Sequence, residues 1–195
     1  MTLSEEGQEM RLDKTIEFPK NFLWGTSASS HQVEGNNIHN DWWEWEQKAG
    51  KIKNGDKSGK ACNHYELYEI DLRMLADMGT NAHRLGIEWS RIVPEEGTVN
   101  RDAINHYRRV LDKAREADLE IFATTHHFAV PLWFAKKGGF LFEKNLDHFK
   151  RYIEIIAQEL SPHLKYWNTI NEPAVYAVAG WLAGEFPPGH QNLDE

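Results

Sequence analysis

Short apolar runs alternate along the chain with segments in which apolar residues recur at helical spacing. The apolar runs cover residues 22–28, 81–89, 119–125 and 166–170. Runs of this length, bounded by polar residues and glycine, are typical of buried strands. Helices are predicted between successive runs, because apolar residues three and four positions apart place their side chains on one helix face.

The predicted helices carry their own start and stop signals. Their apolar positions are Leu67, Ile70, Met74, Leu75 and Met78, then Ile104, Tyr107, Val110, Leu111, Ala114 and Ala117, then Leu146, Phe149, Ile153, Ile156 and Leu160. Asn63, Asn100 and Asn145 lie where an N-cap residue is expected. Gly79 follows the first helix, at a position where glycine commonly ends helices, and Pro162 follows the third.

The alternation of strands and helices predicts a parallel sheet built from right-handed βαβ units. Polar residues cluster at the ends of the predicted strands: Arg84 lies within the second, His126 and His127 follow the third, and Asn171 and Glu172 follow the fourth. Such residues are typical of a site at the carboxyl edge of an α/β barrel or an open sheet. No GxGxxG or GxxxxGK[ST] motif follows a strand, which disfavours a nucleotide-binding open sheet.

Composition narrows the classes of function. The 195 residues carry a net charge of −8, with 41% hydrophobic and 27% charged residues, which indicates one globular domain and argues against nucleic acid as a partner. A single cysteine, Cys62, fits a reducing compartment. The polar N-terminus resembles no secretory signal, and the longest apolar run, residues 174–184, is well short of a membrane span. We therefore expect a cytoplasmic protein without a membrane partner.

Glu172 is the strongest candidate for chemistry. It follows an aromatic strand (YWNTI) and is flanked by Asn171 and Pro173. A carboxyl group in apolar surroundings has a raised pKa, which suits a general acid, and a neighbouring Asn can bind a substrate hydroxyl. A strand-end carboxylate paired with a nearby cation is the alternative interpretation.

The sequence resembles glycoside hydrolase family 1, the retaining β-glucosidases and β-galactosidases. Five blocks carry the resemblance in the family's order: FPKNFLWGTSASSHQVEG (18–35), HRLGIEWSRIVP (83–94), HHFAVPLW (126–133), WNTINEP (167–173) and GEFPPG (184–189). The implied fold is the N-terminal half, about four βα units, of a (β/α)8 TIM barrel. Residues 1–195 would then form a single partial barrel domain, with 1–17 as an N-terminal extension and 18–195 as strands 1–4 with their helices and loops.

The resemblance implies a role for each matching residue. Glu172 matches the acid/base that protonates the leaving glycosidic oxygen and later activates water. Asn171 matches the residue that binds the sugar 2-hydroxyl, Gln32 the glutamine on the 3- and 4-hydroxyls, and His127 the histidine on the 3-hydroxyl. Arg84 matches the arginine that keeps the nucleophile ionised. The family needs neither a cofactor nor a metal, and its substrates are β-linked mono- or oligosaccharides and aryl or alkyl glycosides.

Three of these positions have another interpretation. His126 beside His127 could suggest a metal site, but no further ligand group has zinc-like spacing. Arg84 could be a structural ion-pair partner, a role that coincides with the functional one in this family. The role of Gln32 is supported only by the sequence block in which it lies.

Two positions depart from the family pattern. Phe128 stands where the family usually has tryptophan, so an indole N–H contact to the sugar is lost while a ring face remains for stacking. Ala129 replaces the usual polar residue. The nearby Trp42, Trp43 and Trp45 could line a substrate entrance or pack their loop against the barrel.

The second carboxylate of a retaining glycosidase is missing from this sequence. The family carries its nucleophilic glutamate in a Glu-Asn-Gly block on the seventh strand, and no such block occurs here. Glu34 and Glu88 match structural positions in the family pattern. We expect the chain to be inactive alone and, with two open sheet edges, to bind the C-terminal half of the barrel or to self-associate. A non-hydrolytic carbohydrate-binding or interaction module derived from such an enzyme is the alternative function.

Overall fold

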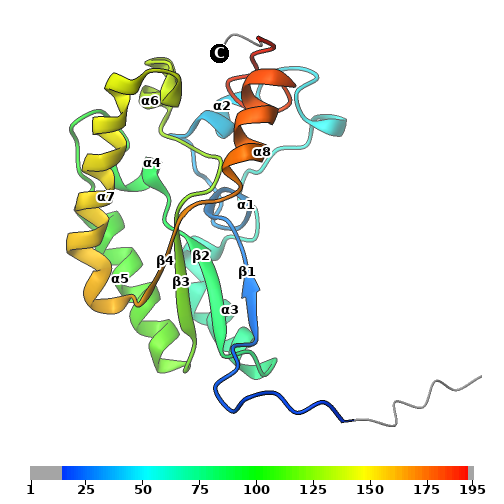
Figure 1. Ribbon diagram of the computed structural model, residues 1–195, viewed down its shortest axis with the longest axis vertical. Helices are drawn as coiled ribbons and strands as arrows, with labels where there is room; N and C mark the ends of the chain where they lie inside the picture. The colour runs from blue at the N-terminus through cyan, green and yellow to red at the C-terminus, as the bar shows by residue number, and fades with distance from the viewer. Residues whose placement is uncertain (1–14, 193–195) are drawn as a thin grey trace, which may run out of the picture.

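The computed structural model describes residues 15–192 and contains a four-stranded parallel sheet. The strands are β1 (Gly25–Ser27), β2 (Ala82–Gly86), β3 (Glu120–His126) and β4 (Tyr166–Ile170), and they lie in sequence order (Figure 1). Consecutive parallel strands joined by helices confirm the predicted βαβ pattern. The first two strands, β1 with three residues and β2 with five, are each shorter than the predicted runs 22–28 and 81–89.

The helices connect and cap the strands. The longer ones are α3 (His64–Asp77), α5 (Arg101–Glu116) and α7 (Leu146–Leu160). The shorter ones are α1 (Ser30–Val33), α2 (Asp41–Glu46), α4 (Trp89–Ile92), α6 (Leu132–Lys136) and α8 (Pro173–Ala177), which continues as a π-helical turn over Val178–Leu182. Short 3₁₀ turns cover Lys53–Gly55, Gly139–Leu141, Glu143–Asn145 and Ser161–His163. No helix within residues 15–192 is long and apolar enough to cross a membrane.

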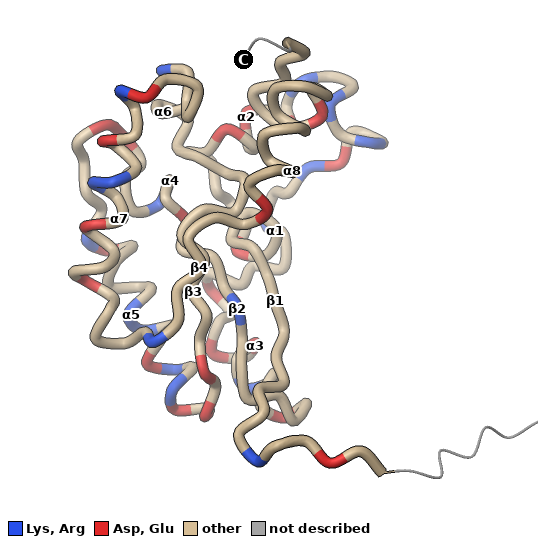
Figure 2. Tube along the Cα trace, in the orientation of Figure 1, with Lys and Arg blue, Asp and Glu red and all other residues tan. Residues whose placement is uncertain are grey.

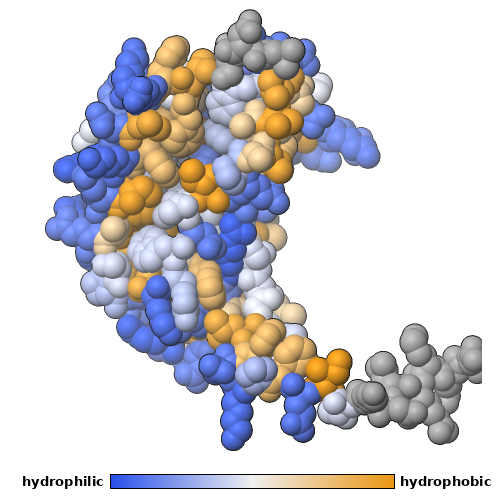
Figure 3. Space-filling view, viewed as in Figure 1, coloured by the Kyte–Doolittle hydropathy of each residue, from blue (hydrophilic) through white to orange (hydrophobic). Residues whose placement is uncertain are grey.

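The core lies between the sheet and its outer helices. Trp89 is 2% exposed and stacks on Tyr152 with ring centroids 5.1 Å apart, while Ile104 of α5 and Ile156 of α7 are fully buried. Most charged residues lie along the outer helices and loops (Figure 2). In the space-filling view the molecule is a crescent whose inner side is hollowed (Figure 3). The helices therefore cover one face of the sheet and leave the other face open.

The three predicted N-caps have different outcomes. The Asn100 side chain accepts hydrogen bonds from the backbone N–H groups of Asp102 and Ala103 at 3.1 and 3.2 Å, as predicted. Asn63 is the N-cap residue of α3, as predicted, but it lies in the left-handed region (φ 57°) and its side chain makes no capping hydrogen bond. Asn145 instead donates to two loop carbonyls at 3.0 and 2.9 Å, because the preceding turn needs these hydrogen bonds.

We expect Asn100→Ala to destabilise the protein by about 1 kcal/mol, because two N–H groups of α5 lose their acceptor. The measurement is the midpoint of urea unfolding. Asn105→Ala is the control, since Asn105 is exposed on the same helix, where alanine favours helix formation. Equal midpoints for Asn100→Ala and the parent would contradict the capping role.

The predicted apolar face of α3 is not the face that packs on the sheet. Leu67, Ile70, Met74 and Met78 are 40%, 63%, 52% and 66% exposed, whereas Leu72 of the same helix is 1% exposed. Helix α3 therefore carries apolar side chains on two sides. Periodicity correctly gave a helix but could not show which side packs inward.

A second exposed apolar group precedes β1. The rings of Phe18, Phe22 and Trp24 lie with centroids 4.7 Å apart, and each is at least 39% exposed. We call this aromatic group and the exposed side of α3 the open apolar surface. Of the predicted extension 1–17, residues 1–14 lie outside the described residues, and 15–17 adopt no regular structure.

Candidate active site

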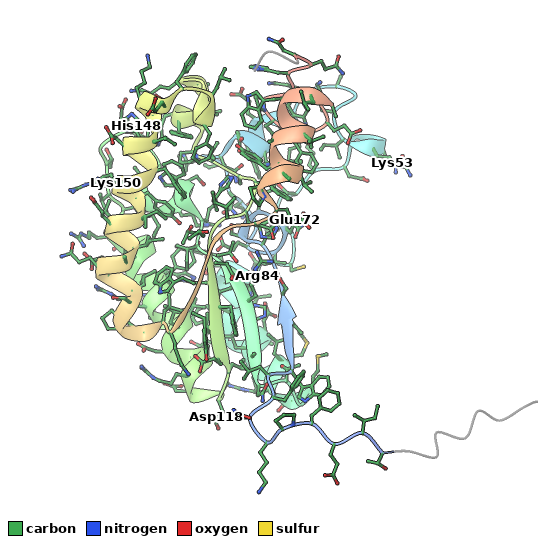
Figure 4. All side chains as sticks on the ribbon, in the orientation of Figure 1. Lys53, Arg84, Asp118, His148, Lys150 and Glu172 are labelled. Carbon is green, nitrogen blue, oxygen red and sulfur yellow. The ribbon has the colours of Figure 1, made fainter. Side chains whose placement is uncertain are left out.

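The carboxyl ends of the strands carry the candidate residues. Arg84 belongs to β2, His127 directly follows β3, and Asn171 and Glu172 directly follow β4. Because the strands are parallel, these residues share one edge of the sheet. Figure 4 shows Glu172 where β4 leads into α8, with Arg84 on the neighbouring part of the sheet.

The Arg84 guanidinium joins two neighbouring strands. Its Nε donates to Thr124 Oγ1 on β3 at 2.8 Å, and its Nη2 donates to Asn171 Oδ1 at 2.7 Å. These bonds fix the planar guanidinium and direct the Asn171 amide oxygen toward it. The Asn171 amide nitrogen is left as a donor, and the guanidinium has further N–H groups for a carboxylate.

His127 is held in its neutral form. Its ring is half-buried, and Nδ1 has no hydrogen-bond partner among the described residues. Burial and, as the smaller cause, the positive charge of Arg84 together lower the pKa of His127 to about 4. A neutral imidazole has one donor and one acceptor nitrogen, so at neutral pH it can bind a hydroxyl group in either sense.

Glu172 occupies a strained backbone position. Its φ and ψ of 44° and 62° place it in the left-handed region, and it forms the N-cap of α8 just before Pro173. A non-glycine residue there costs about 1–3 kcal/mol, and such strain clusters at functional sites. The side chain is exposed, so the predicted apolar surroundings of its carboxyl are wrong for this chain. The Glu172 side chain is instead exposed to solvent, one residue after Asn171.

Comparison with known proteins identifies the family. The family model for glycosyl hydrolase family 1 matches residues 14–195. The chain belongs to this family. It is 33% identical over 182 residues to beta-glucosidase A of Thermotoga maritima, and 36% identical over 182 residues to beta-glucosidase 10 of Oryza sativa subsp. japonica. These matches cover 90% and 88% of this chain but 41% and 34% of the relatives, so the chain spans between about one third and two fifths of their length.

Solved structures of the family agree with the fold. A beta-glycosidase from Pyrococcus horikoshii superposes with a TM-score of 0.84 at 48% identity, covering 90% of this chain and 40% of that structure. A beta-glucosidase from Thermotoga maritima gives 0.87 at 33% identity, with 90% and 41% covered. The parallel sheet and its helices are therefore the N-terminal part of a TIM barrel, as predicted.

In this family 1 chain, Gln32 lies on α1, directly after β1, and its side chain is exposed at the same edge of the sheet. Helix α1 is tied to the segment after β2, because the Ser30 hydroxyl donates to Glu88 Oε2 at 2.7 Å. Gln32 is thus placed on a short helix whose start is anchored, but the described contacts do not join it to Arg84 or Asn171.

An aromatic wall flanks the site. The Phe128 ring lies 5.2 Å from Phe186 and 6.2 Å from Tyr176, centroid to centroid, and Phe186 lies 4.9 Å from Trp42. Sequence reasoning predicted the Phe128 ring face but missed Phe186 and Tyr176 as its neighbours. Their position in and before the GEFPPG block was the available signal.

The other carboxylates near the site are structural. Glu34 is 4% exposed, accepts from Tyr107 Oη and Arg91 Nε at 2.7 Å each, and has a pKa raised by burial. Glu88 is 2% exposed and accepts from the Ser30 and Ser90 hydroxyls. Both carboxylates are occupied by protein donors. Over residues 15–192, no three His, Cys, Asp or Glu side chains come together as a metal site.

Thr124 is a site residue that the sequence reasoning missed. Its hydroxyl accepts from Arg84 Nε, and it is 1% exposed on β3. A buried threonine two residues before His126 gives only a weak signal in the sequence, because β-branched residues are ordinary in strands.

Proposed function

We propose that this chain carries the acid/base half of a β-glycosidase that hydrolyses terminal β-linked sugars with retention of configuration. The observation that supports it most is the Arg84–Asn171 hydrogen bond of 2.7 Å, formed at the strand ends directly beside Glu172. It gathers a cation, an amide donor and a carboxyl group at the edge where α/β barrels carry their active sites.

Glu172 acts as the general acid and then as the general base. In the first step its carboxyl group gives a proton to the glycosidic oxygen, while a second carboxylate attacks the anomeric carbon and the bond to the leaving group breaks. In the second step the Glu172 carboxylate takes a proton from water, which attacks the anomeric carbon and releases the sugar. The second carboxylate comes from the part of the family fold beyond this chain.

The remaining residues bind the sugar. The Asn171 amide nitrogen donates to the 2-hydroxyl, a contact that strengthens in the oxocarbenium-like transition state. Neutral His127 binds the 3-hydroxyl, and the exposed Gln32 amide binds the 3- and 4-hydroxyls. Arg84 keeps the nucleophile ionised through its remaining N–H groups, and the Phe128 ring stacks on a sugar face. Structures of the Thermotoga maritima beta-glucosidase in complex with glucoimidazole and with castanospermine support a glycoside substrate. A cytoplasmic location remains a prediction from the cysteine content.

The partner in this proposal is the rest of the barrel. The open apolar surface and both edges of the sheet have no cover within residues 15–192. Burying exposed apolar side chains contributes roughly 25 cal/mol per Å², and closing a barrel removes unpaired strand edges. A segment that carries the remaining βα units provides both, and a second copy of this chain is the alternative cover.

We expect the isolated 195-residue chain to associate, because the open apolar surface exposes residues such as Ile70 and Met74. Light scattering should give a mass above that of the monomer, and the Ile70→Lys, Met74→Lys double variant should lower it. Leu146→Lys, 46% exposed at the start of α7, is the control and should change the mass less. A monodisperse parent monomer with sharp cooperative melting would contradict the expectation.

The function is tested by hydrolysis of an activated aryl β-glucoside. The purified chain is assayed alone and together with a polypeptide that supplies the remaining βα units of a family 1 barrel, with Glu172→Gln prepared in parallel. We expect turnover only from the combined protein, and its loss in the variant. Sugar binding without turnover by the combined protein would overturn hydrolysis in favour of a carbohydrate-binding module.

A further inference from the structure

The segment after β1 is hydrogen-bonded to the loop after β3. The Asp41 backbone N–H donates to the Val130 carbonyl at 3.0 Å, and the Val130 N–H donates to Asp41 Oδ1 at 2.9 Å. The Leu132 N–H donates to the His39 carbonyl at 2.8 Å, and Asn40 forms an antiparallel bridge with Pro131. Two segments about 90 residues apart are therefore joined by reciprocal bonds centred on Asp41.

This junction directly follows a strained turn. The Ala129 N–H donates to the His127 carbonyl two residues earlier, at 2.9 Å, and the central residue Phe128 has a φ of 68°. A three-residue turn with a positive central φ is rare and unfavourable, and a bulky aromatic residue there persists only when its surroundings hold it. The bonds to Val130 fix the next residue along, so they are the contacts that hold the turn.

Asn40 connects the Asp41–Val130 junction to α1, the helix that carries the predicted sugar contact Gln32. Its Nδ2 lies 3.0 Å from His31 Nδ1, and His31 precedes Gln32 on α1. Asn40 is fully buried and Asp41 is 7% exposed. The dipeptide thus lies between the loop that carries His127 and the helix that carries Gln32.

We propose that Asp41 is a positioning residue, whose carboxyl group holds the His127–Phe128 turn in the conformation that presents both side chains to the sugar. Asp41 does not itself touch the sugar in this proposal, and the inference rests on the proposed function of the site. It adds to that function a carboxyl group that affects sugar binding through the turn and takes no part in the chemical steps.

The carboxyl group of Asp41 also gives the junction a distinctive titration. Burial raises the pKa of Asp41 to about 8; the Val130 N–H opposes this rise and the negative charge of Glu88 adds to it. Tyr176 of α8 faces Asp41, and the adjoining cavity is also lined by Glu44, Lys48, Lys136 and His190. The group is therefore neutral at pH 7, and asparagine matches its shape, its charge and its acceptor oxygen.

The test places a fluorine probe in the turn. 4-Fluorophenylalanine at Phe128 is observed by fluorine NMR in the 195-residue chain between pH 6 and 9.5, with the same label at Phe122 of β3 as a second position. We expect one step with a midpoint near pH 8 at residue 128, because Asp41 ionises there whereas His127, with a pKa of about 4, does not. Asp41→Asn should keep the resonance position at pH 7 and abolish the step. Asp41→Leu should move or broaden the resonance.

Asp147→Asn is the matched control, because Asp147 is exposed on α7 and should leave the step unchanged. A step that persists in Asp41→Asn, or a resonance at 128 that Asp41→Leu leaves in place, would overturn the proposal. Should Asp41→Leu fail to fold by circular dichroism, the comparison of the parent with Asp41→Asn decides. The fluorine measurement does not depend on hydrolysis. A combined protein without turnover would therefore contradict the proposed function, while the fluorine spectra would still test whether Asp41 positions the turn.

Discussion

By the proposed mechanism, Glu172→Gln in a protein that combines this chain with the remaining βα units should lower kcat/KM on a β-linked disaccharide by about 10²–10⁴-fold, the usual contribution of a positioned proton donor. The leaving group of a β-linked disaccharide is the second sugar, an alcohol that leaves poorly, so its departing oxygen needs the proton that glutamine cannot give. The measurement is initial-rate hydrolysis of cellobiose and of an activated aryl β-glucoside by the parent and the variant.

The two substrates should respond differently. An activated aryl group leaves without acid assistance, so formation of the glycosyl-enzyme should survive and the loss should move to the second step, where water needs a base. A burst of aryl alcohol followed by slow turnover is the expected signature. Glu185→Gln, exposed at the end of the same segment, is the control. Equal losses on both substrates with no burst would contradict the acid/base assignment.

The sheet and its order could be predicted from the sequence because the strands are short apolar runs bounded by polar residues. The fourth run coincides with β4, at Tyr166–Ile170. The first strand was overestimated: β1 is Gly25–Ser27, and Phe22 and Trp24 lie outside it as part of the exposed aromatic group. Apolar character marks a residue that tends to be covered, but it does not say whether a neighbouring strand or another segment covers it.

Side-chain partners were harder to predict than positions. The pattern correctly placed Arg84, His127, Asn171 and Glu172 at strand ends, and their separate roles came from the family resemblance. The bond from Arg84 to Thr124 depends on the register of β2 against β3, which no local pattern specifies. The three asparagines at helix starts also look alike in sequence, although only the Asn100 side chain makes a capping hydrogen bond, because tertiary contacts decide the conformation of each.

We expect acid to unfold this protein at a higher pH than titration of its carboxylates alone would give, because three of its histidines are buried in the neutral form. His83, His106 and His126 are 6%, 6% and 2% exposed, and burial lowers the pKa of each to about 4 from the usual 6.5. Between pH 6.5 and 4 the unfolded chain therefore binds more protons than the folded one, so the free energy of unfolding falls as the pH falls.

The size of this effect is comparable with total stability. One pKa unit corresponds to about 1.4 kcal/mol, so three such histidines together can remove much of the roughly 5–15 kcal/mol that holds a typical domain folded. We expect a cooperative loss of circular dichroism between pH 6.5 and 4. A transition that begins only below pH 4 would show that carboxylates, and not these histidines, govern acid unfolding.

A single substitution separates the histidine contribution from the rest. His106 stacks on Tyr65 with ring centroids 3.7 Å apart, so His106→Phe keeps the stacked ring and removes the group that must take up a proton. The midpoint of acid unfolding should move down by about half a pH unit. His148→Gln, at a partly exposed position beside Glu96, is the control and should leave the midpoint in place. Equal shifts in both variants would mean that general charge repulsion drives the unfolding, whereas a shift confined to His106→Phe assigns it to the buried neutral histidines.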